Sequence, residues 1–142
     1  MTTQTAAAPT AGKGLHLGLW VVQVLIGLAF LMAGLGKSTQ PIAELGKNMP
    51  WALAVPEALV RFIGVSELLG GLGLILPSAT RIQPKLTGFA AVGLVIVMVL
   101  AAGFHATRGE YPGIGVNVVL GGLAAFVAWG RLVKAPIAPR GS

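Results

Sequence analysis

The sequence contains no cysteine and very few charged residues. Of its 142 residues, four are Asp or Glu and ten are Lys or Arg, whereas 55% are hydrophobic. The missing cysteines exclude disulfides, thiol redox chemistry, cysteine-bound iron–sulfur clusters and covalently attached haem. The missing charges, with a mean hydropathy of +0.84, exclude an ordinary soluble domain. The natural solvent of such a chain is a lipid bilayer.

The few charged residues leave long apolar gaps between them. A helix needs about 20 apolar residues to cross a hydrocarbon core of roughly 30 Å. No charged residue falls within 14–36, 86–107 or 111–130, which are 23, 22 and 20 residues long. A fourth stretch, 62–80, contains one, Glu67, which is costly inside a membrane. Because these runs are apolar on all sides, they predict membrane spans rather than the core of a soluble helical protein.

We therefore predict an all-α integral membrane protein, a four-transmembrane-helix bundle over residues 13–134. Two of the expected helix ends precede Pro77 and Pro136. The helices are expected at about 15–36, 57–76, 85–105 and 113–133. Residues 1–12 have the composition of a disordered tail. Residues 135–142 form a C-terminal tail whose Pro-Arg-Gly-Ser ending resembles part of an expression tag.

The connection between the first two predicted helices is long, about 20 residues. A structureless loop of that length is uncommon, and Trp51 with its apolar neighbours suits a membrane interface. We expect a short helix there, on the outer surface of the bundle. Residues 27–32 resemble 93–98, and residues 69–72 resemble 120–123, which fits two related hairpins.

Basic residues are unevenly divided between the two predicted faces. With a cytoplasmic N-terminus, six Lys and Arg residues lie inside without any acid, and four lie outside beside three acids. By the positive-inside rule, we expect a multi-pass protein of the inner (plasma) membrane with both termini cytoplasmic. The net charge of +6 does not indicate a nucleic-acid partner, because no basic cluster with interleaved aromatic residues is present.

Polar residues inside or beside the predicted spans are the candidate site. Glu67, Asn117 and Gln23 lie on helix faces rich in glycine, where membrane helices pack closely, so they should point into the bundle. Glu67 should be either a protonated hydrogen-bond donor or half of an ion pair with Arg61 or Lys37. The candidates for ligand binding or proton handling are Glu67, Arg61, Lys37, His105, Asn117, Arg108 and Gln23.

Two interpretations of these residues stay open. They could simply tie helices together, with the basic side chains extending to the outer interface. They could instead line an outward-facing polar pocket for a small ligand, a quinone or a proton path. His16 and His105 belong to opposite membrane faces, which argues against a haem held by both, and no spacing of His and carboxylates indicates a metal site.

The sequence resembles the DoxX and DoxX-like family of small four-helix membrane proteins over about residues 20–130. The residues that carry the resemblance are Gly34, Leu35, Gly36, Lys37; Leu45, Gly46, Pro50; Gly64, Val65, Ser66, Glu67, Leu68, Leu69, Gly70, Gly71; Ala90, Ala91, Met98; and His105. The resemblance implies a membrane component of a thiosulfate:quinone oxidoreductase or of an oxidative-stress-linked membrane complex.

The leading hypothesis is a redox-associated membrane subunit that binds a quinone or another lipid-like small molecule in an outer-half pocket around Glu67. Any oxidoreductase activity would need a bound cofactor or a partner, since the chain supplies no redox centre of its own. We expect membrane lipids as partners, and a homo-oligomer or larger membrane complex. The alternatives are a small-molecule or proton carrier and a non-catalytic helical scaffold.

Overall fold

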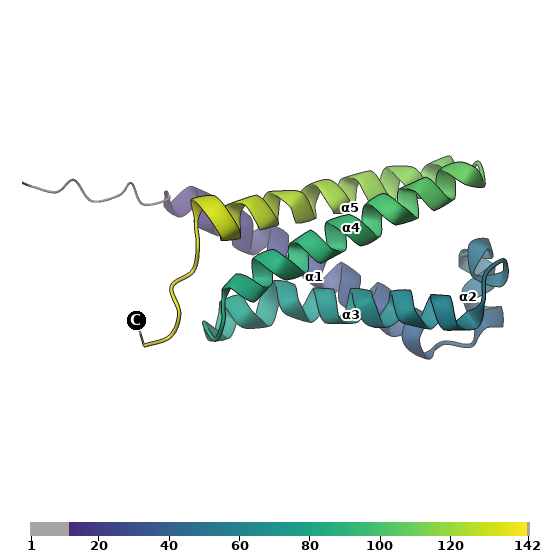
Figure 1. Cartoon of the computed structure of the whole chain (residues 1–142), viewed down its shortest axis with the longest axis horizontal. Helices are drawn as coiled ribbons and strands as arrows, with labels where there is room; N and C mark the ends of the chain where they lie inside the picture. Colours follow the sequence, from purple (N-terminus) through teal and green to yellow (C-terminus); the bar gives the residue numbers. More distant parts are fainter. Residues whose placement is uncertain (1–11, 142) are drawn as a thin grey trace, which may run out of the picture.

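The computed structural model describes residues 12–141, which form a bundle of long helices with a small helical cap (Figure 1). Four helices in this range are long and apolar enough to cross a membrane, which confirms the predicted all-α bundle of four spans. The predicted tail over residues 1–12 lies outside the described residues except for Gly12. The elements are α1 (Lys13–Thr39), α2 (Ile42–Asn48), η1 (Pro50–Leu53), α3 (Glu57–Thr80), α4 (Lys85–Thr107), α5 (Tyr111–Trp129) and η2 (Gly130–Lys134).

The long helix α3 continues through Pro77, where the sequence predicted its end. It stops at Thr80, and Arg81 follows in the left-handed conformation with φ of 58°. A proline this close to a helix end removes one backbone hydrogen bond and leaves most of the helix intact. The Thr80 hydroxyl makes an additional contact in the last turn, because it donates to the carbonyl oxygen of Leu76 at 2.7 Å.

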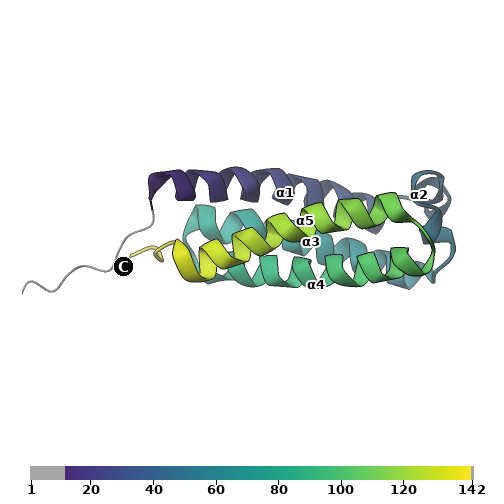
Figure 2. The same cartoon turned by 90° about the horizontal axis from the view of Figure 1, so that it is seen from above.

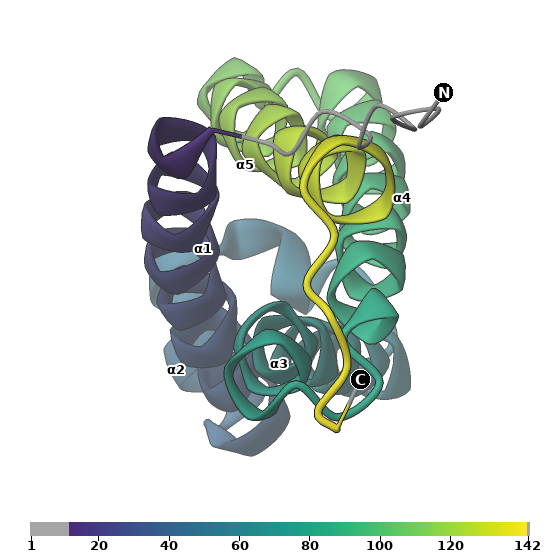
Figure 3. The ribbon, with the colours of Figure 1, turned by 90° about the vertical axis from the view of Figure 1, so that its left-hand side faces the viewer.

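The four long helices form two pairs, α1 with α3 and α4 with α5 (Figures 1 and 2). The start of α1 and the C-terminal segment lie at one end of the bundle, here called the termini end. Figure 3 looks onto this end and shows the long helices arranged around a common axis. The two pairs diverge toward the opposite end, the loop end, where α2 and η1 lie. These two elements are the short helical connection that the sequence predicted between the first two spans.

Glycines set the close packing of α1 on α3. A Cβ added to Gly64 would lie 2.7 Å from the Cβ of Lys37 and from the backbone nitrogen of Ser38, and one on Gly34 would collide with the backbone of α3. A second contact of this kind joins Gly27 and Gly71, further toward the termini end. Because there is no side chain between them, the two backbones approach closely, as membrane helices require for strong packing.

The apolar core fills the middle of the bundle and the space toward the termini end. It contains side chains from all four spans, which close the gap between the two helix pairs below the loop end. Its buried members are Ile26, Phe30, Leu74, Ala91, Leu94, Met98, Ala124, Val127 and Ala128. A smaller cluster of Leu45, Ala52 and Val60 fixes α2 and η1 onto the start of α3. The two helix pairs are thus packed together at one end and separated at the other.

Candidate functional site

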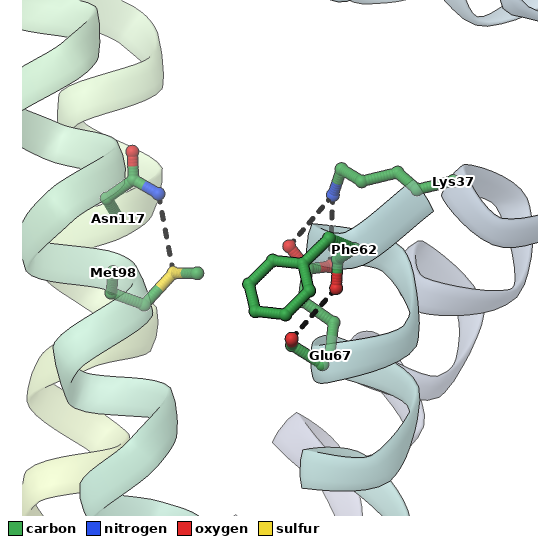
Figure 4. A network of polar contacts seen from close by, with 6 residues as sticks. Lys37, Phe62, Glu67, Met98 and Asn117 are labelled. Atoms are coloured by element: carbon green, nitrogen blue, oxygen red, sulfur yellow. Dashed lines mark hydrogen bonds and ion pairs between the residues drawn. The ribbon is translucent and has the colours of Figure 1, made fainter. Parts of the chain in front are cut away.

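A cavity of about 830 Å³ lies between the two helix pairs at the loop end. Its volume falls within the range of sites for small molecules, and such sites are mostly apolar with a few polar groups. The wall from α1 and α3 includes Phe62, Lys37 and Glu67, and the wall from α4 and α5 includes Met98 and Asn117. Figure 4 shows these two walls facing each other across the cavity.

An ion pair between Lys37 and Glu67 forms the polar part of the first wall. The Lys37 Nζ donates to both carboxylate oxygens of Glu67, each at 3.0 Å (Figure 4). The two side chains are 11% and 5% exposed, so the pair is largely withdrawn from solvent. Of the two states predicted for Glu67, the structure has the ion pair, and Lys37 is the partner. The close contact at Gly34 and Gly64 places Lys37 beside α3, one turn from Glu67.

Arg61, the other predicted partner of Glu67, has a different role. Its Nη1 donates to the carbonyl oxygens of Lys37 at 2.9 Å and Gln40 at 2.6 Å, and its Nη2 donates to the Glu57 carboxylate at 3.1 Å. The first two contacts satisfy carbonyl groups at the end of α1 that have no helical partner. Arg61 therefore holds the end of α1, and with it Lys37, against α3 without lining the cavity.

The second wall carries an amide that is only partly satisfied. Asn117 is 9% exposed, and its Nδ2 donates to the sulfur of Met98 at 3.3 Å. The Oδ1 atom is buried and has no hydrogen-bond partner among residues 12–141. A buried acceptor without a partner costs free energy, so this amide is a candidate for contact with a ligand. Gly121 lets the two helices approach here, because a Cβ on it would lie 3.2 Å from the Cβ of Met98.

Aromatic rings cover the cavity at the loop end. Trp51 of η1 reaches α4, where its ring centroid lies 6.1 Å from Phe104 and 6.5 Å from His105, both in edge-on geometry. Such contacts add to the stabilisation from burial. Because η1 belongs to the connection between α1 and α3, the contact of Trp51 with α4 links the two diverging helix pairs. We call Trp51, Phe104 and His105 the aromatic roof.

Glu110 stands beside this roof and binds two basic residues. Its Oε1 lies 3.2 Å from Nδ1 of His105 and accepts from Nε of Arg108 at 2.8 Å. Burial acts to raise the pKa of Glu110, but the hydrogen bonds and charges of His105 and Arg108 outweigh it and hold the pKa below its usual value. Of these three, His105 and Glu110 line the cavity, and Arg108 does not.

Gln23 does not belong to this site, although the sequence grouped it with Glu67 as a pocket residue. It lies toward the termini end, where its amide nitrogen Nε2 donates to the Leu74 carbonyl at 2.8 Å and to the Ser78 hydroxyl at 3.2 Å. Its Oε1 accepts from Nε of Arg131 at 2.6 Å, and Arg131 also reaches Nδ1 of His16 at 3.1 Å. The apolar core separates this network from the cavity, so Gln23 joins α1 to α3 and η2.

Sequence reasoning missed several residues that line the cavity. Phe62, Met98 and Glu110 line the cavity but were not among the candidates, and Met98 was named only as a residue that carries the family resemblance. The spacing of His105, Arg108 and Glu110 around a tight turn was a usable signal, because such a turn brings oppositely charged side chains together. Trp51 was expected only at the membrane interface, since nothing in the sequence indicates that η1 reaches across to α4.

These features define a small multi-pass α-helical membrane protein with a ligand-sized cavity between two helix pairs. The family model described as the DoxX-like family matches residues 21–127, about three quarters of the chain. The chain belongs to the DoxX-like family. No curated protein and no solved structure matches it. The family assignment confirms the resemblance found in the sequence.

Proposed function

We propose that this protein binds a lipid-like small molecule, with a quinone as the leading case, in the cavity at the loop end. The observation that carries the proposal is a cavity of about 830 Å³ whose walls are largely apolar and aromatic but contain the buried Lys37–Glu67 pair. Apolar walls favour a hydrophobic ligand, and a small number of fixed polar groups supplies orientation and specificity.

The charges around the cavity favour a ligand that is polar but uncharged. Lys37 is neutralised by Glu67, and Glu110 is neutralised by Arg108, with His105 also in contact. An ionic ligand would have to compete with these partners and lose its hydration, which is expensive. A ligand carbonyl group does not have to displace Glu67, because Lys37 has three N–H donors and makes two contacts with Glu67. Being uncharged, a carbonyl group also loses less hydration than an ion. The ring carbonyl of a quinone fits this chemistry.

We further propose that the protein is a redox-associated subunit of a plasma-membrane complex, with both termini in the cytoplasm. The support is the family assignment and the distribution of basic residues in the sequence. Reducing a quinone to a quinol takes two electrons and two protons. The residues around the cavity can hold and orient the quinone, while the electrons must come from a partner subunit or bound cofactor.

Binding of decylubiquinone to the purified protein tests the ligand proposal. Trp51 lies in the cavity wall, so quinone binding should quench its fluorescence in a variant that retains it as the single tryptophan, made with Trp20→Phe and Trp129→Phe. The Lys37→Met/Glu67→Met double variant should lose at least tenfold in affinity. As a matched control, Lys47→Met/Glu44→Met removes an exposed pair of the same residue types and should bind normally. Absence of saturable quenching in the single-tryptophan protein would refute the proposal.

A small-molecule or proton carrier is the second candidate function. The observation that favours it is the divergence of the two helix pairs, which are packed together at the termini end and separated around a polar pair at the loop end (Figure 1). Rocking of two such halves is a common basis of transport across membranes. Proton or solute flux in proteoliposomes that disappears in the double variant would favour this function over a binding subunit, whereas no flux above that of empty liposomes would exclude it.

A further inference from the structure

The cavity is partly covered at the loop end by the aromatic roof and has exposed apolar residues on α3 and α4. Three residues that line it, Leu59 and Phe62 of α3 and Leu100 of α4, are 43%, 69% and 68% exposed. Side chains exposed at this level of a membrane-spanning helix face either lipid or the cavity. These three line the cavity and are also large apolar groups that lipid tolerates. They form the rim of a side opening, which we call the α3/α4 window.

The two sides of this window lie at similar depth in the bundle. Phe62 is five residues from the start of α3 and Leu100 is seven residues from the end of α4. At 1.5 Å per residue, they lie roughly 8 and 10 Å below the loop end of their helices. The hydrocarbon core of one leaflet is roughly 15 Å deep. The window therefore opens at the level of the acyl chains of one leaflet.

The opposite side, between α1 and α5, is less suited to be an entrance. The exposed lining residues of α1 and α5 are Ala29, Pro112 and Val116. Ala29 lies ten residues from the end of α1, and Val116 lies five residues from the start of α5, so their depths differ by roughly 8 Å. Ala29 and Val116 therefore lie at different depths, whereas Phe62 and Leu100 lie at similar depth along their helices.

The aromatic roof lies across the loop end of the cavity, beside the exposed lining residues Asn48 and Pro50. Trp51 contacts Phe104 and His105, and the Arg108 guanidinium lies over the Phe104 ring, 5.7 Å from its centre. Glu110 then holds both His105 and Arg108. A ligand arriving from water would have to break several of these contacts. A ligand arriving from lipid needs only the turning of apolar side chains such as Phe62, which are free to change rotamer.

We infer that the cavity is loaded sideways from the membrane leaflet at the loop end, through the α3/α4 window and beneath the aromatic roof. The occupant is an uncharged amphiphile dissolved in that leaflet, with its polar group at Lys37 and its apolar part leading out between Phe62 and Leu100. This inference rests on the proposed function for the identity of the ligand, but the route can be tested separately.

Accessibility of a single cysteine tests the route without a ligand. Because the chain has no cysteine, Ser66→Cys supplies the only thiol, on a cavity-lining residue of α3. In proteoliposomes it should react at least tenfold faster with a membrane-soluble pyrene maleimide than with a charged, impermeant maleimide. The control, Lys47→Cys, replaces a loop-end side chain that is 68% exposed and does not line the cavity, and it should react readily with both reagents. Equally fast reaction of Ser66→Cys with the charged reagent would overturn the lateral route.

Closing the window tests the same route with a ligand. The Phe62→Cys/Leu100→Cys variant, bridged by a bis-maleimide, should take up tritiated decylubiquinone at least tenfold more slowly than the unbridged variant. Bridging Glu44→Cys/Lys47→Cys, an exposed pair outside the cavity lining, should leave the rate unchanged. An unchanged rate after the Phe62/Leu100 bridge overturns the α3/α4 assignment. If decylubiquinone does not bind the unbridged protein, the proposed ligand fails, and the Ser66→Cys reaction still decides the route.

Discussion

Removing one partner of the Lys37–Glu67 pair should destabilise the protein much more than removing both. The side chains are 11% and 5% exposed, and Nζ lies 3.0 Å from each carboxylate oxygen. Glu67→Met leaves a desolvated ammonium group without its counter-charge, a change that costs about 3–5 kcal/mol in buried pairs. For a chain of this length, such a loss corresponds to a fall in Tm on the order of 10 °C.

The double variant Lys37→Met/Glu67→Met should recover most of this loss. An apolar pair of similar volume requires no compensation for buried charge, and such replacements are often neutral or stabilising. The chain also offers a matched control in Lys47 and Glu44, which form the same type of pair at 3.0 Å but are 68% and 57% exposed. Lys47→Met should cost no more than about 1 kcal/mol, because solvent screens exposed pairs.

Thermal unfolding of the detergent-solubilised variants measures these differences, and a double-mutant cycle isolates the coupling between the two residues. The reasoning predicts strong coupling for Lys37 and Glu67 and weak coupling for Lys47 and Glu44. Equal losses for Lys37→Met and Lys47→Met would refute it. So would single-variant losses at Lys37 and Glu67 that simply add up in the double variant, since the two residues would then not stabilise the fold as a pair.

Three further predictions concern helix packing, pH and topology. Gly64→Ala should lower stability by about 1–3 kcal/mol through overpacking against α1, whereas Gly93→Ala, whose Cβ would meet nothing within 4 Å, should be neutral or slightly stabilising in thermal unfolding. Although burial opposes it, hydrogen bonds from two basic neighbours hold the pKa of Glu110 below 4.5. The contribution of Glu110 to stability is therefore fully present above its unfolded-state pKa and is lost as pH falls through the lower folded-state pKa. The Tm advantage of the protein over Glu110→Gln should persist from pH 7 to 5 and shrink below pH 4.5. An advantage that shrinks already between pH 7 and 5 would contradict this assignment. In intact cells, an impermeant maleimide should label Lys47→Cys and spare Lys13→Cys, and the reverse pattern would invert the topology.

Much of the fold could be read from the sequence because the bilayer imposes simple requirements. A span needs about 20 apolar residues, and its backbone groups must be satisfied within the segment, so the charge-free runs identify the helices directly. The glycines on α1 and α3 also indicated which faces would pack, and Gly34 and Gly64 do lie in the contact between these helices. Pro77 misled the prediction of a helix end, because one lost hydrogen bond near a terminus does not stop a helix that is already packed.

The sequence could only narrow the choices at the site. It indicated that Glu67 is an intramembrane carboxylate that needs protonation or a partner, but both Lys37 and Arg61 were available to it. The choice depends on where the end of α1 sits on α3, which places Lys37 at the carboxylate and turns Arg61 to backbone carbonyls and Glu57. It also depends on depth along the bundle, which removes Gln23 from the site and places it with Arg131.

The scarcity of charge and the apolar runs were enough to determine the membrane class and the number of spans, because both follow from local composition, while the absence of cysteine only excluded certain chemistry. The cavity and its roof could be decided only by the tertiary structure. They arise from the angle between two helix pairs and from the reach of Trp51 across to α4, and neither depends on any single segment. Hydrophobicity specifies that a helix enters the membrane, but it does not specify how far two helix pairs diverge once both are there.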